Sequence, residues 1–147
     1  MTEKIGNVWI FIEQEGGKIA DVSLELVCKG RELAQRLGVK AEGLLIGNNL
    51  AGGVDSLYQY GCDTVYLVED PRLEPFTVQP FAKVIIDMIK AHKPNILLFG
   101  ATHKGRELGP RVASEKLAGL TADCTDLQID DFDDKVNKQF YKNKLMQ

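Results

Sequence analysis

The chain has 147 residues, of which 44% are hydrophobic and 27% are charged, and its net charge is −3. A chain of this length forms one domain with a core of its own, because it buries roughly 70% of the surface that it exposes when unfolded. The weak net charge argues against nucleic acid or an anionic membrane as the main partner. The composition also excludes a disordered acidic tail.

Three cysteines, Cys28, Cys62 and Cys124, are far apart and form no CxxC pair. The sequence therefore predicts neither a zinc site nor a disulfide framework, and we expect free thiols that are buried as small apolar side chains in a reducing, cytoplasmic compartment. No basic segment followed by an apolar run opens the chain, and its most apolar stretch, 84–89, contains Asp87. We expect no signal peptide and no membrane insertion.

Short apolar runs alternate with longer amphipathic segments along the chain. Runs of β-branched, aliphatic and aromatic residues predict strands over 8–12, 43–47, 64–68 and 95–100. Apolar residues at helical spacing, some followed by glycine, predict helices over 20–37, 54–60, 77–91 and 109–117. Alternating residues then predict two strands, 124–129 and 138–142, around an acidic turn.

Continuous apolar strands separated by amphipathic helices are typical of a parallel sheet that is covered on both faces. The βαβαβα order predicts a single doubly wound, mostly parallel, nucleotide-binding-like α/β domain over residues 1–147. Residues from about 124 to 147 would form a peripheral antiparallel hairpin and a tail. In such sheets ligands bind beyond the carboxyl ends of the strands, where the strand order switches. The loops after the strands are therefore the places to search for a site.

The loop after the second strand, 47–53, is rich in glycine but lacks the lysine and hydroxyl of a phosphate-binding P-loop. It also lacks the GxGxxG spacing of dinucleotide-binding proteins. We interpret it as a flexible turn whose asparagines cap the next helix.

The loop after the fourth strand, 100–111, combines glycines, a hydroxyl and positive charge. Its candidate site residues are Thr102, Lys104, Gly105, Arg106 and Arg111. Glycines let a backbone approach a ligand, and the N–H groups at a helix start favour anions. The loop thus fits an anionic ligand or a partner's acidic side chain. It fits equally a solvated turn whose arginines pair with Glu107 or Glu115.

No catalytic constellation emerges from the sequence. His103 has no cysteine or serine nucleophile beside it, so we interpret it as solvated, and His92 suits a helix end. The acidic residues of 130–134 are most simply solubilising. The sequence therefore predicts no catalytic residue and no metal ligand.

Two blocks of the sequence resemble motifs of electron transfer flavoprotein alpha subunits. Residues 98–113 read LFGATHKGRELGPRVA and residues 117–127 read LAGLTADCTDL. The family pattern is a strand end of small residues, then Gly-Arg-acidic-Leu-x-Pro-Arg-x-Ala, then Gly-Leu-x-x-Asp. Residues 7–13 also resemble the family's opening strand, so that the resemblance extends from about 7 to 129.

The resemblance implies the N-terminal domain of such an alpha subunit, with an adenine nucleotide alpha hydrolase-like fold. That domain packs on a beta subunit, and the complex carries electrons from dehydrogenases such as acyl-CoA dehydrogenases to an acceptor. The redox FAD belongs to a C-terminal alpha domain that no segment here matches, and AMP or a second FAD belongs to the beta subunit. The resemblance thus implies a fragment or a short gene product without redox FAD of its own, an electron-carrier component and not an enzyme.

For Gly105 and Arg106 the resemblance favours a structural or subunit-interface role over cofactor contact. Two other classes stay open. One is a stand-alone nucleotide-binding or stress-type domain, suggested by the glycine loops. The other is a small enzyme that uses His103.

Overall fold

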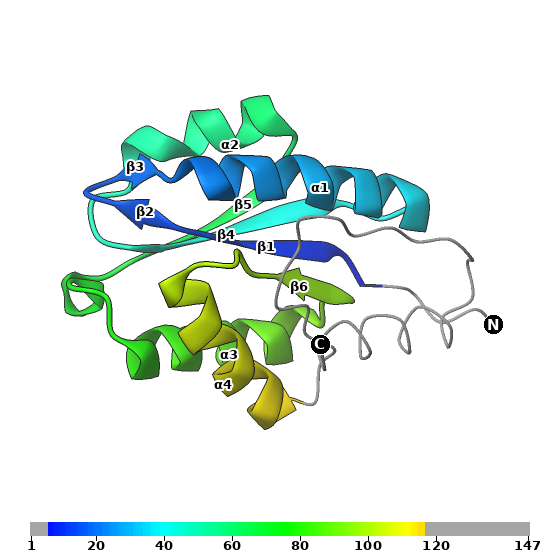
Figure 1. The fold of residues 1–147 in the computed structure, drawn as a ribbon. Helices are drawn as coiled ribbons and strands as arrows, with labels where there is room; N and C mark the ends of the chain where they lie inside the picture. Colours follow the sequence, from blue (N-terminus) through cyan, green and yellow to red (C-terminus); the bar gives the residue numbers. More distant parts are fainter. Residues whose placement is uncertain (1–5, 117–147) are drawn as a thin grey trace.

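The structure is a computed structural model that describes residues 6–116 (Figure 1). Four parallel strands form its main sheet in the order β5-β4-β1-β6. These strands are β1 (Val8–Ile12), β4 (Ala41–Gly47), β5 (Thr64–Glu69) and β6 (Ile96–Leu98). The α-helices are α1 (Asp21–Leu37), α2 (Val54–Tyr60), α3 (Val78–His92) and α4 (His103–Lys116), and the short 3₁₀ helices are η1 (Ala51–Gly53) and η2 (Pro71–Leu73). The predicted parallel α/β architecture is confirmed.

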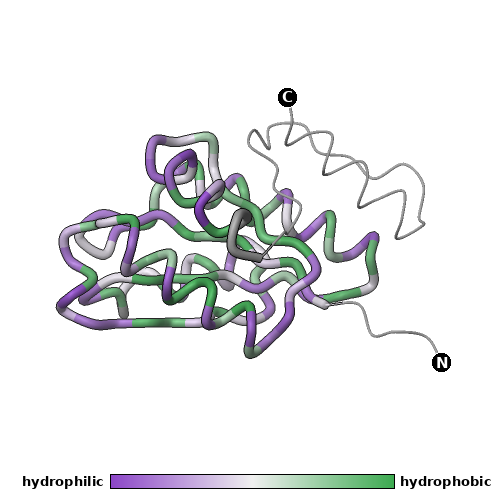
Figure 2. The backbone as a smooth tube through the Cα atoms, turned by 90° about the horizontal axis from the view of Figure 1, so that it is seen from below, coloured by the Kyte–Doolittle hydropathy of each residue, from purple (hydrophilic) through white to green (hydrophobic). Residues whose placement is uncertain are grey.

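The sheet separates two apolar layers, with α1 and α2 on one face and α3 and α4 on the other (Figure 1). Alternate residues of the fully buried strand β1 divide between them. Ile10 and Ile12 pack toward α1, whereas Trp9 and Phe11 pack toward α3 and α4. Figure 2 shows hydrophobic and hydrophilic residues alternating within the helical turns, as expected for helices that bury one side.

Helix α4 begins at His103, six residues before the start predicted from the sequence. Pro110, which was expected in a first turn, lies inside this helix, where it cannot donate a backbone hydrogen bond to the carbonyl of Arg106. Packing outweighs this local cost, because Leu108 and Val112 of α4 are buried in the layer below the sheet. Most of the predicted polar loop is therefore helix.

A small antiparallel pair that the sequence analysis did not predict follows β1. Strand β2 (Gln14–Glu15) pairs with β3 (Lys18–Ile19) around two glycines. Gly16 and Gly17 have φ values of 60° and 87°, and consecutive positive φ angles are what a two-residue hairpin turn requires. The hairpin predicted within 124–142 lies outside the described residues.

The cysteines differ from one another in burial. Cys62 is buried as expected, and burial, followed by the nearby Asp63 carboxylate, raises the pKa of its thiol to about 12. Cys28 is exposed on α1, so the prediction that it is buried is wrong. Its neighbour Val27 takes the core-facing position at this turn of the helix. Cys124 lies outside the described residues. Within residues 6–116, the structure contains no helix both long and apolar enough to traverse a lipid bilayer.

Candidate functional site

The strand order switches between β1 and β6. The chain builds the sheet outward from β1 through β4 to β5 and then returns to add β6 on the other side of β1. Ligands in open parallel sheets bind near the carboxyl ends of strands at such a switch. Glu13 follows β1 at this point, and Thr102 follows β6.

A hydrogen bond joins these two strand ends. The Thr102 hydroxyl donates to Oε2 of Glu13 across 2.6 Å, although the residues are 89 positions apart in the chain. Thr102 Oγ1 also accepts a hydrogen bond of 3.1 Å from the Gly105 N–H, so it caps the first turn of α4. The backbone N–H of Glu13 in turn donates to Ser23 Oγ at 2.7 Å. Helices α1 and α4 are thereby both fastened to the end of β1.

Gly105 has no room for a side chain. A Cβ at this position would collide with the carbonyl oxygen of Gly100, at the end of the β6 segment. The backbones of α4 and of residue 100 therefore pack directly against each other, with no space for a side chain between them. Among the predicted site residues, Thr102 and Gly105 hold the helix against the sheet.

The three predicted basic residues do not come together. Lys104 points across the switch, with Nζ 3.4 Å from the carbonyl oxygen of Gln14 and 5.2 Å from the ring centroid of Phe76. The Arg106 side chain is exposed on the surface of α4. Arg111 instead lines a separate cavity of about 320 Å³ beside α3. The geometry therefore leaves Lys104 as the one member of this basic trio that reaches the cavities at the switch.

Glu107, one of the two acidic residues considered as partners of the loop arginines, contacts a histidine of its own helix. His103 Nε2 lies 2.8 Å from Oε1 of Glu107, one helical turn along α4, and the histidine side chain is 88% exposed. His103 therefore faces solvent, as the sequence analysis interpreted it.

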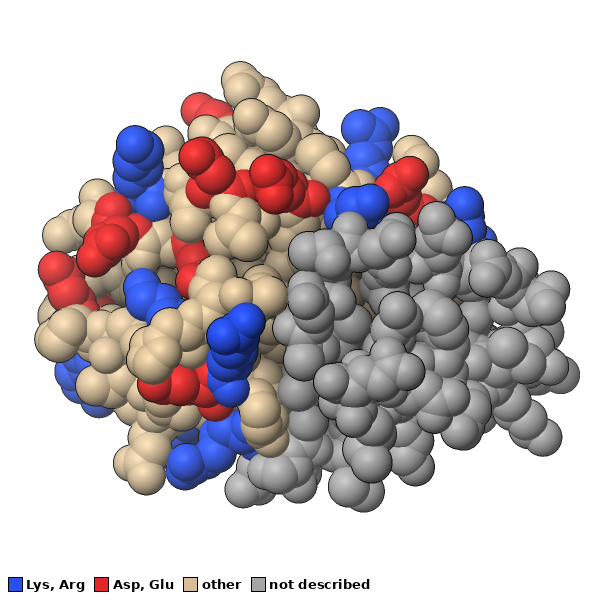
Figure 3. Space-filling view, in the orientation of Figure 1, with Lys and Arg blue, Asp and Glu red and all other residues tan. Residues whose placement is uncertain are grey.

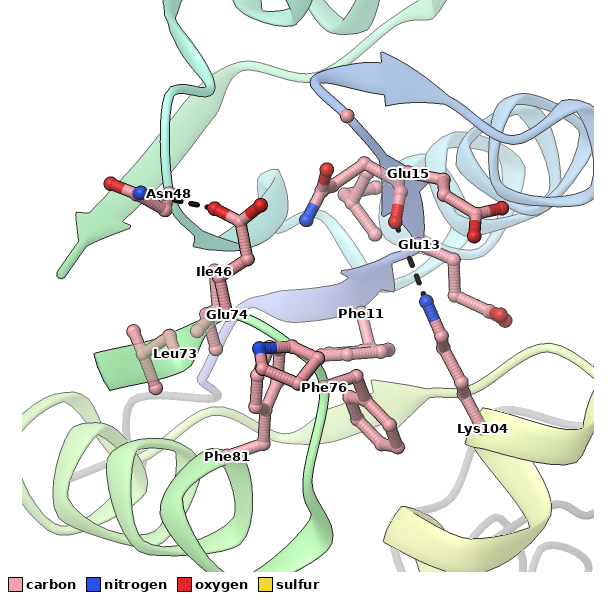
Figure 4. Close-up of a pocket in the computed structure, with 14 residues that line it drawn as sticks. Phe11, Glu13, Glu15, Ile46, Asn48, Leu73, Glu74, Phe76, Phe81 and Lys104 are labelled. Carbon is pink, nitrogen blue, oxygen red and sulfur yellow. Dashed lines mark hydrogen bonds between the residues drawn. The ribbon is translucent and has the colours of Figure 1, made fainter. Parts of the chain in front are cut away.

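One of two adjoining cavities at the switch, which we call the switch cavity, has a volume of about 390 Å³. Its walls are formed by residues of β1 and the β2–β3 turn, the end of β4, the segment 73–76, α3 and α4 (Figure 4). Its aromatic side chains are Phe11, Phe76 and Phe81, and the Phe76 and Phe81 rings meet edge to face at 4.7 Å. A second cavity of about 480 Å³ adjoins the first and shares Glu13, Gln14, Glu15 and Lys104 with it.

The charges that line the switch cavity are predominantly negative. Glu13, Glu15 and Glu74 contribute three carboxyl groups, against the single ammonium group of Lys104. Figure 4 shows Glu15 and Glu74 on different sides of the cavity, with Lys104 reaching in from α4. Figure 3 shows the acidic and basic side chains intermingled on the face that it presents. Among the side chains that the structure describes, no three of His, Cys, Asp or Glu are grouped so that they could hold a metal ion.

The loop after β4 contributes to the same cavity in an unexpected way. Asn48 Nδ2 donates to Oε2 of Glu74 at 3.0 Å, and Asn49 adopts a left-handed conformation with φ of 58°. The prediction that these asparagines cap the next helix is wrong, because η1 and α2 follow Leu50 and Gly53 without a side-chain cap. Asn48 instead orients a carboxylate of the cavity.

The acidic residues of the cavity were not predicted from the sequence. Glu13 carried a usable signal, because a charged residue directly after a buried strand lies at the ligand-binding edge of a parallel sheet. Glu74 and Phe76 carried no such signal, since their segment reads as a turn.

Asp70 caps η2 by accepting a 2.9 Å hydrogen bond from the Arg72 N–H, and η2 leads directly into the cavity wall.

Comparison with known proteins gives one consistent family. The family model described as "Electron transfer flavoprotein domain" matches residues 8–147. The chain is 43% identical over 125 residues to electron transfer flavoprotein subunit alpha of Thermoanaerobacterium thermosaccharolyticum, covering 85% of this chain and 38% of that protein. It is 46% identical over 128 residues to protein FixB of Rhizobium meliloti, covering 84% of this chain and 36% of that protein. The chain thus spans less than two fifths of either relative.

The fold is also similar to a solved structure with little sequence likeness. A universal stress protein from Archaeoglobus fulgidus aligns with a TM-score of 0.52 at 13% identity, over 80% of this chain and 97% of that one. At this identity the likeness concerns the fold alone. It agrees with the doubly wound parallel sheet.

Proposed function

The chain belongs to the electron transfer flavoprotein family, and from this membership we propose that it serves as the N-terminal domain of an alpha-type subunit in an electron carrier. The carrier would pass electrons from flavin dehydrogenases, such as acyl-CoA dehydrogenases, to an acceptor. The observation that carries the proposal is the family match across residues 8–147, together with 43% identity to an alpha subunit.

In this proposal the domain is a framing and docking part and not an enzyme. The flavin of the assembled complex performs the redox chemistry, because such chemistry belongs to the cofactor and the protein supplies binding and orientation. This chain would pack on a beta subunit. Thr102 and Gly105 would keep α4 in place against the sheet, and the exposed side chain of Arg106 would be available for contact with the partner.

The charge of the switch cavity supports the claim that this domain does not hold the redox FAD itself. FAD carries a negatively charged pyrophosphate, and three carboxyl groups against one ammonium group line the cavity. Like charges in a partly enclosed cavity repel strongly, because they are screened less than they are in bulk water. The cavity therefore disfavours the phosphate groups of a dinucleotide.

The visible absorption spectrum of the purified chain tests this claim. The 147-residue chain is incubated with excess FAD, desalted and measured, and a complete alpha–beta electron transfer flavoprotein is treated in parallel as the positive control. We expect flavin absorbance in the control and none with the chain alone. Stoichiometric flavin retained by the chain would overturn the claim that the redox site lies elsewhere.

The alternative of a stand-alone nucleotide-binding or stress-type domain predicts a different result. Such a domain would bind ATP or AMP near the switch, and titration calorimetry would detect micromolar affinity. The acidic lining of the switch cavity argues against this alternative, because it repels phosphate groups. In addition, neither Arg106 nor Arg111 lines the cavity. Absence of heat at millimolar nucleotide would remove the alternative, and micromolar binding would establish it.

A further inference from the structure

The proposed electron-carrier role assigns no function to the charged cavity at the strand switch. Its three carboxyl groups come from two separate segments, Glu13 and Glu15 from the end of β1 and β2, and Glu74 from the segment after η2. Together with the ammonium group of Lys104 they leave a formal excess of two negative charges. We name this space, lined by the residues around Glu13, Glu74, Phe76 and Lys104, the acidic cavity.

Glu13 is the most informative of these residues. The residue is 8% exposed, and its Oε2 accepts the 2.6 Å hydrogen bond from Thr102. Among residues 6–116, Oε1 accepts no hydrogen bond. Burying a carboxylate is costly unless its oxygens are paired. Glu13 thus places a nearly buried carboxylate, held on one oxygen by Thr102, at the wall of the cavity.

Lys104 shows which chemistry the cavity accepts. Its ammonium nitrogen lies 5.2 Å from the centroid of the Phe76 ring, within the range of a cation–π interaction. Its 3.4 Å contact with the Gln14 carbonyl is long for a hydrogen bond. A tethered cation therefore already lies over an aromatic face in this space, with imperfect hydrogen bonding. A second cation with better geometry would find both an aromatic surface and free carboxylate oxygens.

We propose that the acidic cavity binds a small organic cation with a planar guanidinium or amidinium head and an apolar body. A planar cation stacks on an aromatic ring and donates two parallel hydrogen bonds to a carboxylate, which an ammonium group does not do. The apolar body packs against Phe11, Phe81 and Leu73. A volume of about 390 Å³ is suited to such a molecule. This binding does not depend on the proposed electron-carrier role.

Benzamidine is a suitable probe, because it joins an amidinium head to a phenyl ring. Benzamide is its neutral counterpart of nearly the same shape, and AMP supplies an anion with a planar base. Each compound is titrated into the ¹⁵N-labelled 147-residue chain at neutral pH, and the backbone amide shifts are followed. We expect saturable benzamidine binding that moves the amides of Gln14 and Phe76, at least roughly tenfold tighter than benzamide, because one charged hydrogen-bonded pair accounts for a difference of this size.

Three variants test whether the carboxylates of the acidic cavity, and not the overall charge of the chain, are responsible for benzamidine binding. Glu13→Gln and Glu74→Gln should each weaken benzamidine binding roughly fivefold or more, since each removes a charged acceptor but keeps the side-chain size. Glu74 is exposed, so its variant remains informative if Glu13→Gln fails to fold. Glu32→Gln, on the exposed face of α1, is the matched control and should leave the affinity unchanged.

Lys104→Met gives the sharpest result. If the lysine is a competing internal cation, its removal should tighten benzamidine binding, and added salt should weaken it. Weaker binding in Lys104→Met would overturn the proposal. So would equal affinity for benzamide and benzamidine, the absence of saturable benzamidine binding, or AMP binding that moves the same amides. A failure of this kind leaves the flavin test of the electron-carrier role unaffected.

Discussion

Replacing Gly105 by alanine tests the close approach of α4 to the sheet. Gly105 is buried in the first turn of α4. An added Cβ would collide with the Gly100 carbonyl oxygen and would lie 3.1 Å from the Gly100 carbonyl carbon. These are backbone atoms, which cannot rotate away as the end of a flexible side chain can. Helix α4 would have to shift away from the strand end.

The expected cost follows from two opposing effects. Alanine is favoured over glycine in a helix by about 1 kcal/mol. Overpacking costs about 1–3 kcal/mol, and the upper value applies where backbone blocks the added atom. A shift of α4 also strains the hydrogen bonds that join Thr102 to Gly105 and to Glu13, each of which contributes about 0.5–3 kcal/mol. We expect Gly105→Ala to lower the free energy of unfolding by about 2–4 kcal/mol.

Urea unfolding followed by circular dichroism measures this change. Gly52→Ala is the matched control, because nothing lies within 4 Å of a Cβ at that position. We expect the control to change stability by less than about 1 kcal/mol, in the stabilising direction. If Gly105→Ala is as stable as the unmodified chain to within about 0.5 kcal/mol, the described packing of α4 on residue 100 is incorrect.

Two further perturbations probe individual side chains. Burial, and then the neighbouring Glu42 carboxylate, raises the pKa of Tyr66 above its ordinary value. Ultraviolet absorbance titration of Glu42→Gln should therefore show a lower pKa for Tyr66. An unchanged pKa would refute the contact between Tyr66 and Glu42. In a Cys124→Ser background, a thiol reagent at mildly alkaline pH should modify the exposed Cys28 rapidly and the buried Cys62 slowly, because burial raises the pKa of Cys62 to about 12. Cys28→Ser should therefore abolish the rapid phase, and persistence of that phase would contradict the assigned exposure.

Much of the fold follows from local sequence patterns. The β1 strand, 8–12, and the α2 helix, 54–60, have the predicted bounds, because an apolar run and a glycine-terminated amphipathic segment are strong local signals. The start of α4 was wrong by six residues. Its glycines and its proline are local loop signals, whereas the burial of Leu108 and Val112 in the layer below the sheet, which local patterns do not show, favours the helix.

The position of the candidate site could be predicted from the sequence, but most of the residues that line it could not. The carboxyl-end rule led to the loop after β6, and Thr102 does lie at the switch. Lys104 and Arg106 are two positions apart on a helix, so they point in roughly opposite directions, about 200° apart. Glu13 and Glu74 line one cavity because of the strand order, which local patterns do not determine.

Sedimentation of the chain with an electron transfer flavoprotein beta subunit tests the central proposal most directly. Analytical ultracentrifugation of an equimolar mixture should show one species with the mass of a one-to-one complex. Arg106→Ala should weaken that complex, whereas Lys40→Ala, an exposed cation at the opposite end of the sheet, should not. Two species that sediment independently at concentrations well above micromolar would contradict the account of this chain as a domain that packs on a beta subunit.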